Sequence, residues 1–184
     1  MRYPKEIVLK EGQEAIIRLL QMDDKELLRR FYAGIPEADR WFMRQDVSDP
    51  AVMDKWLDDI DKGKVFSIVA LTEARIVGHA SLQMREFGST RHIGRFRLMV
   101  LPEFRYKRLG TWLLLDLIQL AMDKGLSEVR SDFVVGIEEA AIEAARKFDF
   151  FEKAVLKHYV KDQQGNRHDL LIMIKRLHKN WGDF

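Results

Sequence analysis

Apolar and polar residues follow two different periods along the chain. Where apolar residues recur every three or four positions, as Leu27, Leu28, Phe31 and Tyr32 do, the pattern predicts an amphipathic helix. Where β-branched and apolar residues run together between turn residues, it predicts a strand. Helices are expected at 23–34, 48–63, about 110–124 and 137–148. Strands are expected at 6–9, 15–20, 64–72, 74–86, 92–101, 127–135, 153–162 and 167–176.

The order of these elements limits the fold. The strand–helix–strand unit over 96–134 requires one parallel pair of strands, because its crossover helix returns the chain to the same end of the sheet. The remaining strands are joined by turns and are expected to pair antiparallel. The prediction is an α/β (α+β) fold in which a mixed, mostly antiparallel sheet carries helices on both faces. No linker or repeat divides the chain, so residues 1–184 are expected to form a single domain.

Composition excludes several classes of function. The 31 Lys and Arg residues nearly balance the 29 Asp and Glu residues, so any site for an anion must be local, and nucleic-acid binding is not expected. The chain has no cysteine, which excludes disulfides, thiolate metal sites and a cysteine nucleophile. No apolar run approaches the roughly 18 residues that span a bilayer, and the first residues lack a signal-peptide pattern. These features predict a cytoplasmic protein without membrane contact.

One loop carries a local concentration of positive charge. The sequence "RYKRLGT", 105–111, lies between a predicted strand and a predicted helix. Free backbone N–H groups and the helix dipole favour anions at such a place, and Arg105, Lys107, Arg108 and the Thr111 hydroxyl add to them. The loop therefore favours a pyrophosphate site, with a solvated basic turn as the alternative.

The strand before this loop suggests what else the ligand contacts. If it splays from its parallel neighbour at 127–135, the backbone of 98–101 is left unpaired at the centre of the sheet. An extended ligand with amide groups could add there like a strand. Coenzyme A has this shape, with a pyrophosphate at one end, two amides along its arm and a thioester at the tip.

The stretch "VLPEFRYKRLGTWLLLDLI" resembles the acyl-CoA motif of the GNAT acyltransferase superfamily. The matching residues are Val100, Pro102, Arg105, Leu109, Gly110, Thr111, Leu113 and Leu114. The order of elements agrees over nearly the whole chain, and residues 8–44 are similar to the opening of the bacterial protein-lysine-acetyltransferase type of GNAT domain. The resemblance implies an N-acetyltransferase that uses acetyl-CoA, with direct attack by the amine of a small molecule or protein. It places the cofactor on Leu98, Met99, Val100, Arg105, Tyr106, Lys107, Arg108, Leu109, Gly110 and Thr111.

The chain departs from the family pattern at several functional positions. Tyr106 and Arg108 replace two loop glycines, and a left-handed backbone there would be strained. Ala145 stands where a tyrosine acid is usual, and Arg95 stands where the lysine-acetyltransferase type carries a glutamate base. The alternative hypothesis is therefore a catalytically weak or silent GNAT domain that binds CoA, another nucleotide or a protein partner.

The general acid and base cannot be assigned from the sequence. Glu86, His92 and Asp132 are the weak candidates, since each lies on or beside the two strands of the parallel pair. His79 is expected to be a locally bonded sheet histidine. His158 and His168 have no carboxylate at helical spacing, so no metal site is predicted.

The first two helices and the segment between them are expected to form the acceptor side. Its arginines favour an acidic or carboxylate-bearing acceptor, and the closing hairpin offers an edge on which a homodimer could form. The residues expected on the acceptor side are Phe31, Tyr32, Arg40, Trp41, Phe42, Arg44, Arg95 and Arg97.

Overall fold

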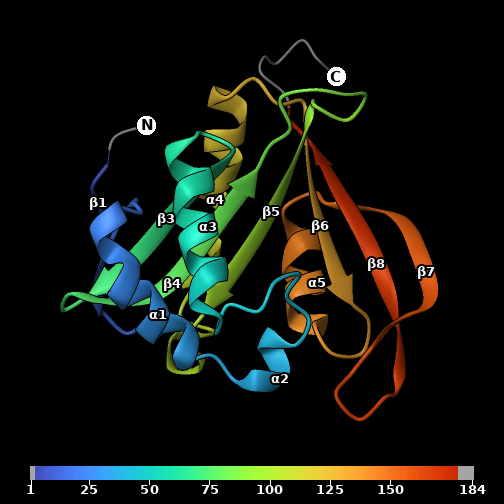
Figure 1. Ribbon diagram of the computed structural model, residues 1–184, viewed down its shortest axis with the longest axis horizontal. Coiled ribbons are helices and arrows are strands. Elements are labelled where there is room, and N and C mark those ends of the chain that lie inside the picture. The colour runs from blue at the N-terminus through green and yellow to red at the C-terminus, as the bar shows by residue number, and fades with distance from the viewer. Residues whose placement is uncertain (1–2, 178–184) are drawn as a thin grey trace.

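The computed structural model describes residues 3–177 and contains one continuous eight-stranded sheet (Figure 1). The strands lie in the order β1-β2-β3-β4-β5-β6-β8-β7. Every neighbouring pair is antiparallel except β5 and β6, which confirms the predicted mixed sheet. Their bounds are β1 Lys5–Val8, β2 Glu14–Leu19, β3 Val65–Thr72, β4 Arg75–Gln83, β5 Ile93–Val100, β6 Glu128–Val134, β7 Phe151–Lys161 and β8 Arg167–Arg176.

Helices cover both faces of this sheet. On β4, a Cβ at Gly78 would meet Leu109 and Leu113 of α4, whereas the next residue, His79, packs its ring against Tyr32 of α1 and Trp56 of α3. Successive strand residues point to opposite faces, so α4 lies on one face and α1 and α3 on the other. The helices are α1 Lys25–Ala33, α2 Glu37–Arg40, α3 Pro50–Asp61, α4 Leu109–Asp123 and α5 Glu139–Lys147.

The predicted helices at the four longer positions are confirmed, and the short α2 is an addition. At the start of α3, the Asp49 carboxylate accepts a hydrogen bond from the backbone N–H of Ala51, and Pro50 occupies the first turn. α2 has only four residues and none of them is buried, so it leaves no apolar period in the sequence.

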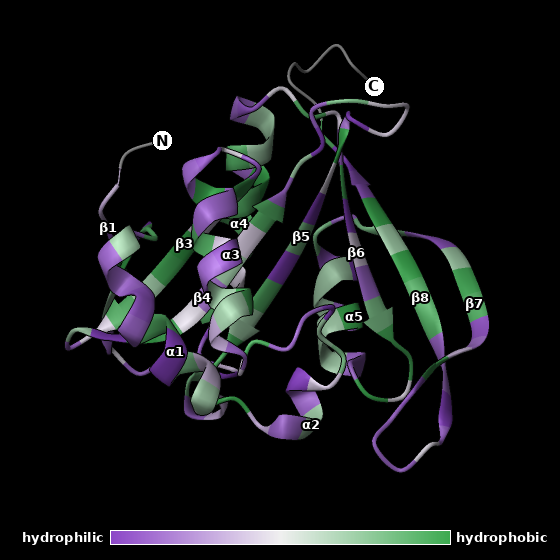
Figure 2. Cartoon of the chain, viewed as in Figure 1, coloured by the Kyte–Doolittle hydropathy of each residue, from purple (hydrophilic) through white to green (hydrophobic). Residues whose placement is uncertain are grey.

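The central strands β3 and β4 are buried along nearly their whole length, and β3 is coloured largely hydrophobic in Figure 2. Burial along β4 is nearly complete from Ile76 to Leu82. At the other end of the sheet, β7 is almost wholly exposed and contacts the rest of the sheet through β8. Among the described residues, no helix is long and apolar enough to cross a membrane.

The parallel contact between β5 and β6 is short. It joins only Ile93, Gly94 and Arg95 to Glu128, Val129 and Arg130. Beyond these residues β5 continues along β4, and β6 continues along β8, so the two strands diverge (Figure 1). The predicted splay is therefore present, and it opens toward the carboxyl ends of both strands.

Candidate functional site

A cavity of about 610 Å³ lies where β5 and β6 diverge. Most of its wall comes from the segment 42–47, strand β5, the loop 105–108 with the first turn of α4, strand β6, and helix α5, and residues of α2, α3 and β4 complete it. α5 contributes only small side chains along its length, namely Ala140, Ala141, Ala144 and Ala145. The small residues leave the gap open on that side.

The unpaired edge of β5 faces this cavity. The backbone N–H of Leu101 donates to the carbonyl of Val77 on β4 at 3.0 Å. Because peptide groups alternate along a strand, those of Leu98 and Val100 point the other way, into the gap. The Val100 carbonyl accepts a hydrogen bond there from Arg105 Nε at 3.1 Å. Met99 lines the cavity with its side chain, while its peptide group faces β4.

The loop before α4 presents a row of backbone donors. Arg108 is the N-cap residue of α4 and makes no side-chain cap. Within residues 3–177, the backbone N–H groups of 106–111 have no recorded acceptor. A Cβ at Gly110 would come no closer than 3.6 Å to Leu98, so the first turn is uncrowded. Free N–H groups and the positive end of the helix dipole make this turn suitable for an anion.

Eight of the ten residues predicted to hold the cofactor line the cavity, and two do not. Lys107 turns away, toward Glu11 at 3.5 Å and over the ring of Phe104. Leu109 is fully buried beneath β4. Arg105 lines the cavity, but its guanidinium is already held by Asp39 at 2.6 Å and by the Val100 carbonyl.

The two residues that replace family glycines adopt the glycine-like backbone. Tyr106 has φ of 61° and Arg108 has φ of 66°, both left-handed. Such a conformation costs an L-residue about 1–2 kcal/mol. The Tyr106 side chain is 85% exposed, so its bulk is directed largely into solvent. The loop thus keeps the shape that the glycines would allow, at a cost in strain.

Because of this strain, replacing a loop residue with glycine should stabilise the protein. Tyr106→Gly should raise the free energy of unfolding by up to about 1 kcal/mol, because relief of 1–2 kcal/mol exceeds the extra entropy that glycine adds to the unfolded chain. Thermal unfolding should show a Tm roughly 2–4 °C higher. Tyr159→Gly is the matched control, since Tyr159 is 66% exposed in β7 and should lose stability on the same change. Equal losses in the two variants would argue against strain at Tyr106.

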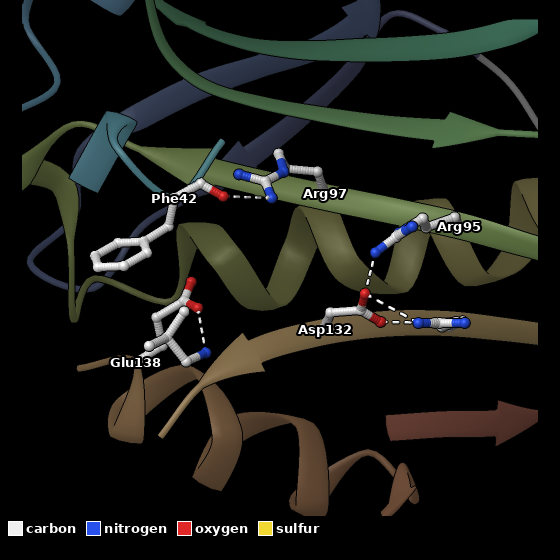
Figure 3. Close-up of polar contacts among 7 residues, drawn as sticks. Phe42, Arg95, Arg97, Asp132 and Glu138 are labelled. Carbon is white, nitrogen blue, oxygen red and sulfur yellow. Dashed lines mark hydrogen bonds and ion pairs between the residues drawn. The ribbon is translucent and has the colours of Figure 1, made fainter. Parts of the chain in front are cut away.

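The structure separates the three catalytic candidates from one another. Glu86 and His92 are exposed and precede β5, at the closed end of the splay, and neither lines the cavity. Asp132 on β6 does line it (Figure 3). Its carboxylate already accepts hydrogen bonds from Arg130, at 2.6 and 3.1 Å, and from Arg95. Both oxygens of the Asp132 carboxylate are therefore already engaged by guanidinium groups.

The histidines within residues 3–177 lie outside the cavity. His79 is buried, and burial lowers the pKa of its imidazole to about 3. Its Nδ1 lies 2.7 Å from the Tyr32 hydroxyl, as expected for a locally bonded sheet residue. His158 and His168 lie on the closing hairpin near Asp169 and Asp162. In the described part of the chain, no group of three ligating side chains could hold a metal.

Glu138 is a cavity residue that the sequence did not single out. It immediately precedes α5, and its Oε2 accepts a hydrogen bond from the Val134 backbone N–H at 2.7 Å (Figure 3). Burial raises the pKa of its carboxyl, although the Val134 hydrogen bond and the charge of Arg97 oppose the shift. The only signal in the sequence comes from the family resemblance. Family members often carry an asparagine at the start of this helix, where this chain has Glu138.

Arg97 lies across the cavity from Glu138 (Figure 3). Its Nη2 donates to the carbonyl of Phe42 at 3.2 Å, and burial lowers the pKa of its guanidinium. Phe42, Arg44 and Arg95 also line the cavity, in agreement with the predicted acceptor side. Four other residues expected there do not line it. Phe31 and Tyr32 are buried in the core, Arg40 donates to the Ile35 carbonyl, and Trp41 donates to the Lys161 carbonyl.

Comparison with known structures places this architecture among acetyltransferases. The ribosomal-protein-alanine N-acetyltransferase of Brucella melitensis is 26% identical, with a TM-score of 0.77 over 88% of this chain and 99% of that one. Salmonella typhimurium yncA, solved with its cofactor acetyl-CoA, is 22% identical, with a TM-score of 0.75 over 91% and 96%. The GNAT domain of S. lividans PAT is 14% identical, with a TM-score of 0.76 over 95% and 97%, and shares the fold.

Sequence comparison gives the family. Among curated proteins none matches this chain. The model of the acetyltransferase (GNAT) family matches residues 26–150, which is more than half of the chain and includes α1, β5, the loop before α4, and α5. The chain therefore belongs to the GNAT acetyltransferase family, whose members transfer an acetyl group from acetyl-CoA to an amine.

Proposed function

We propose that this chain acetylates its amine acceptor inside the cavity between β5 and β6. The observation that supports this most is a single half-open cavity, which joins an unpaired strand edge, an uncapped helix N-terminus and a partly buried carboxylate. Each of these has a separate use in acyl transfer. The alternative of a silent domain is not favoured, because the replaced loop residues preserve the loop backbone.

The cavity fits the arm of acetyl-CoA. The peptide groups of Leu98 and Val100 offer strand-like hydrogen bonds to its amides, and the alanines of α5 leave room beside them. The N–H groups of 109–111, with the Thr111 hydroxyl and the Arg108 guanidinium, would hold its pyrophosphate. When bound, acetyl-CoA supplies the acetyl group as an activated thioester.

The chain's own groups then handle charge and protons. A backbone N–H of Leu98 or Val100 would donate to the carbonyl oxygen that gains negative charge during attack. Glu138 would take the proton that the amine nitrogen loses, and its raised pKa makes it a stronger base than an exposed glutamate. Ala145, at the position of the usual tyrosine acid, lines the cavity and has nothing to donate.

The loop provides a paired test of the cofactor site. Arg108→Glu should weaken acetyl-CoA binding roughly 10- to 100-fold, because a charge-assisted contact becomes repulsive. Lys107→Glu should change it little, since Lys107 points toward Glu11 and not into the cavity. Binding is measured by calorimetry at about 0.15 M salt, where charges farther apart than roughly 8 Å are screened. This condition separates a direct contact with the cofactor from the effect of changing the protein's net charge. Equal losses in both variants, or no binding by the wild type, would refute the assigned site.

Activity itself is tested by thiol release from acetyl-CoA with a panel of amines. We expect turnover with at least one primary amine and none in its absence. If acetyl-CoA binds and no amine supports release, the silent-domain hypothesis is favoured instead. The lysine-acetyltransferase type, the homodimer and the cytoplasmic location stay predictions.

A further inference from the structure

Cationic side chains in the cavity differ in whether they have partners. Arg95 and Arg105 each form an ion pair, with Asp132 and Asp39 respectively. Arg108 lies at the N-terminus of α4, where the cofactor's pyrophosphate is assigned. Arg97, by contrast, has no carboxylate within 4 Å among residues 3–177, and its one recorded hydrogen bond goes to a backbone carbonyl.

A guanidinium that is partly buried in a cavity wall without an ion-pair partner destabilises the protein. Burial disfavours its charged form, and the Phe42 carbonyl engages only one of its five N–H donors. The charge of Glu138 across the cavity offsets part of this cost, and the neighbouring Arg44, which also lines the cavity, adds repulsion. The arrangement becomes favourable when an anion enters, because a carboxylate can accept two parallel hydrogen bonds from one guanidinium.

Position indicates which ligand would bring that anion. Side chains of Arg95, Arg97 and Met99 point to the α1 and α3 face of the sheet, whereas the α4 N-terminus lies on the opposite face. Arg97 is therefore on the acceptor side and away from the pyrophosphate site. Glu138 lies across from it, so the acceptor end of the cavity has one anionic and one cationic wall (Figure 3).

We propose that the acceptor is an amine that carries a carboxylate close to its amino group, as an amino acid does. Its amino group would lie toward Glu138 and its carboxylate toward Arg97. This inference rests on the proposed acetyl transfer and narrows its substrate class. The same chemistry is offered by a free amino acid and by a peptide with an acidic residue beside its amino terminus.

The experiment compares each carboxylate with its uncharged amide. Free amino acids and their carboxamides form one set of acceptors, and peptides with Asp or Asn, Glu or Gln at the second position form the other. We expect kcat/KM to favour the carboxylate member roughly 10- to 100-fold in one of the sets, which also identifies the source. Equal kcat/KM within both sets would overturn the inference while leaving acetyl transfer intact.

Variants test the role of Arg97 directly. Arg97→Gln should abolish the preference for the carboxylate, and Arg97→Lys should keep part of it, since the charge remains while the bidentate geometry is lost. Arg91→Gln is the control, because Arg91 is exposed just before β5 and does not line the cavity. It should keep the preference. Preference retained in Arg97→Gln would contradict the assignment.

A binding measurement makes the result independent of turnover. Calorimetry without acetyl-CoA uses the N-acetyl derivatives of one matched pair from the favoured set, amino acid or peptide. The wild type should bind the carboxylate member more tightly than its amide, and Arg97→Gln should bind the two equally. Circular dichroism confirms that each variant is folded. If wild type binds both ligands equally or binds neither, the proposal fails, whatever the acetyl-transfer assay shows.

Discussion

Glu138→Gln should lower kcat by roughly 10²- to 10⁴-fold, the usual contribution of a general base. Glutamine has the same shape, and its amide oxygen can still accept the hydrogen bond from the Val134 N–H. What it loses is the ability to take a proton from the amine. Acetyl-CoA affinity, measured by calorimetry, should stay close to that of the wild type.

The pH profile separates a base from a residue that only shapes the cavity. Burial raises the pKa of Glu138, so wild-type kcat/KM should fall as pH decreases through that pKa, because protonated Glu138 cannot act. Arg97 lowers this pKa, whereas Asp39 and Asp132 raise it. In Glu138→Gln this fall in kcat/KM at low pH should disappear. A variant with near wild-type kcat and the same fall in kcat/KM at low pH would exclude Glu138 as the base.

The same pKa shift has a consequence for stability. Because the pKa of the folded state is raised above 4.5, the folded protein favours protonated Glu138. At a pH above the folded-state pKa, Glu138 is charged and its burial lowers the free energy of unfolding. At a pH below the pKa of Glu138 in the unfolded chain, Glu138 is protonated in both states and this destabilisation disappears. Glu138→Gln should therefore have a higher Tm than wild type at neutral pH and no such advantage in acid. Higher stability with lower activity is typical of a residue retained for function.

Leu113→Ala should reduce the free energy of unfolding by about 2–5 kcal/mol, the range for removing a buried leucine. Leu113 is fully buried in the first half of α4, and its Cδ1 lies 2.8 Å from where a Cβ at Gly78 would be. Leu113 lies in the helix whose N-terminus is the proposed pyrophosphate site. For a chain of this size, Tm should fall by roughly 4–20 °C in thermal unfolding.

Leu115→Ala provides the control on the same helix. Leu115 is 41% exposed, so the same truncation removes little buried surface and should cost well under half as much. Helix propensity is the same for both changes, and only burial differs. Similar losses in the two variants would mean that α4 is not anchored through Leu113.

The fold was predictable because its signals are local. Asp49 and Pro50 mark the start of α3, and the Arg95–Leu101 pattern marks β5 as a strand that becomes apolar toward its end. The strand–helix–strand unit then requires the parallel pair. The short α2 was missed because four exposed residues have no periodicity.

The site was predictable only where backbone chemistry defines it. Leu98, Arg108 and Thr111, which the loop motif predicts as cofactor residues, line the cavity, while the motif could not show that Lys107 points outward. Side-chain roles depend on partners distant in the sequence. Arg105 is held by Asp39, 66 positions away, and nothing in the local pattern indicates that pair.

Because the contact between β5 and β6 is short, the sheet consists of two halves that are joined only weakly. Strands β1 to β5 form one half, and β6, β8 and β7 form the other, with hydrogen-bonded continuity through three residue pairs. A Cβ at Gly94 would lie 2.5 Å from Leu126 and 2.7 Å from Leu82, so packing at this junction is tight. The angle between the halves sets how far apart the cavity walls stand. Gly94, Leu82 and Leu126 at this junction therefore influence the width of the cavity, although none of them lines it.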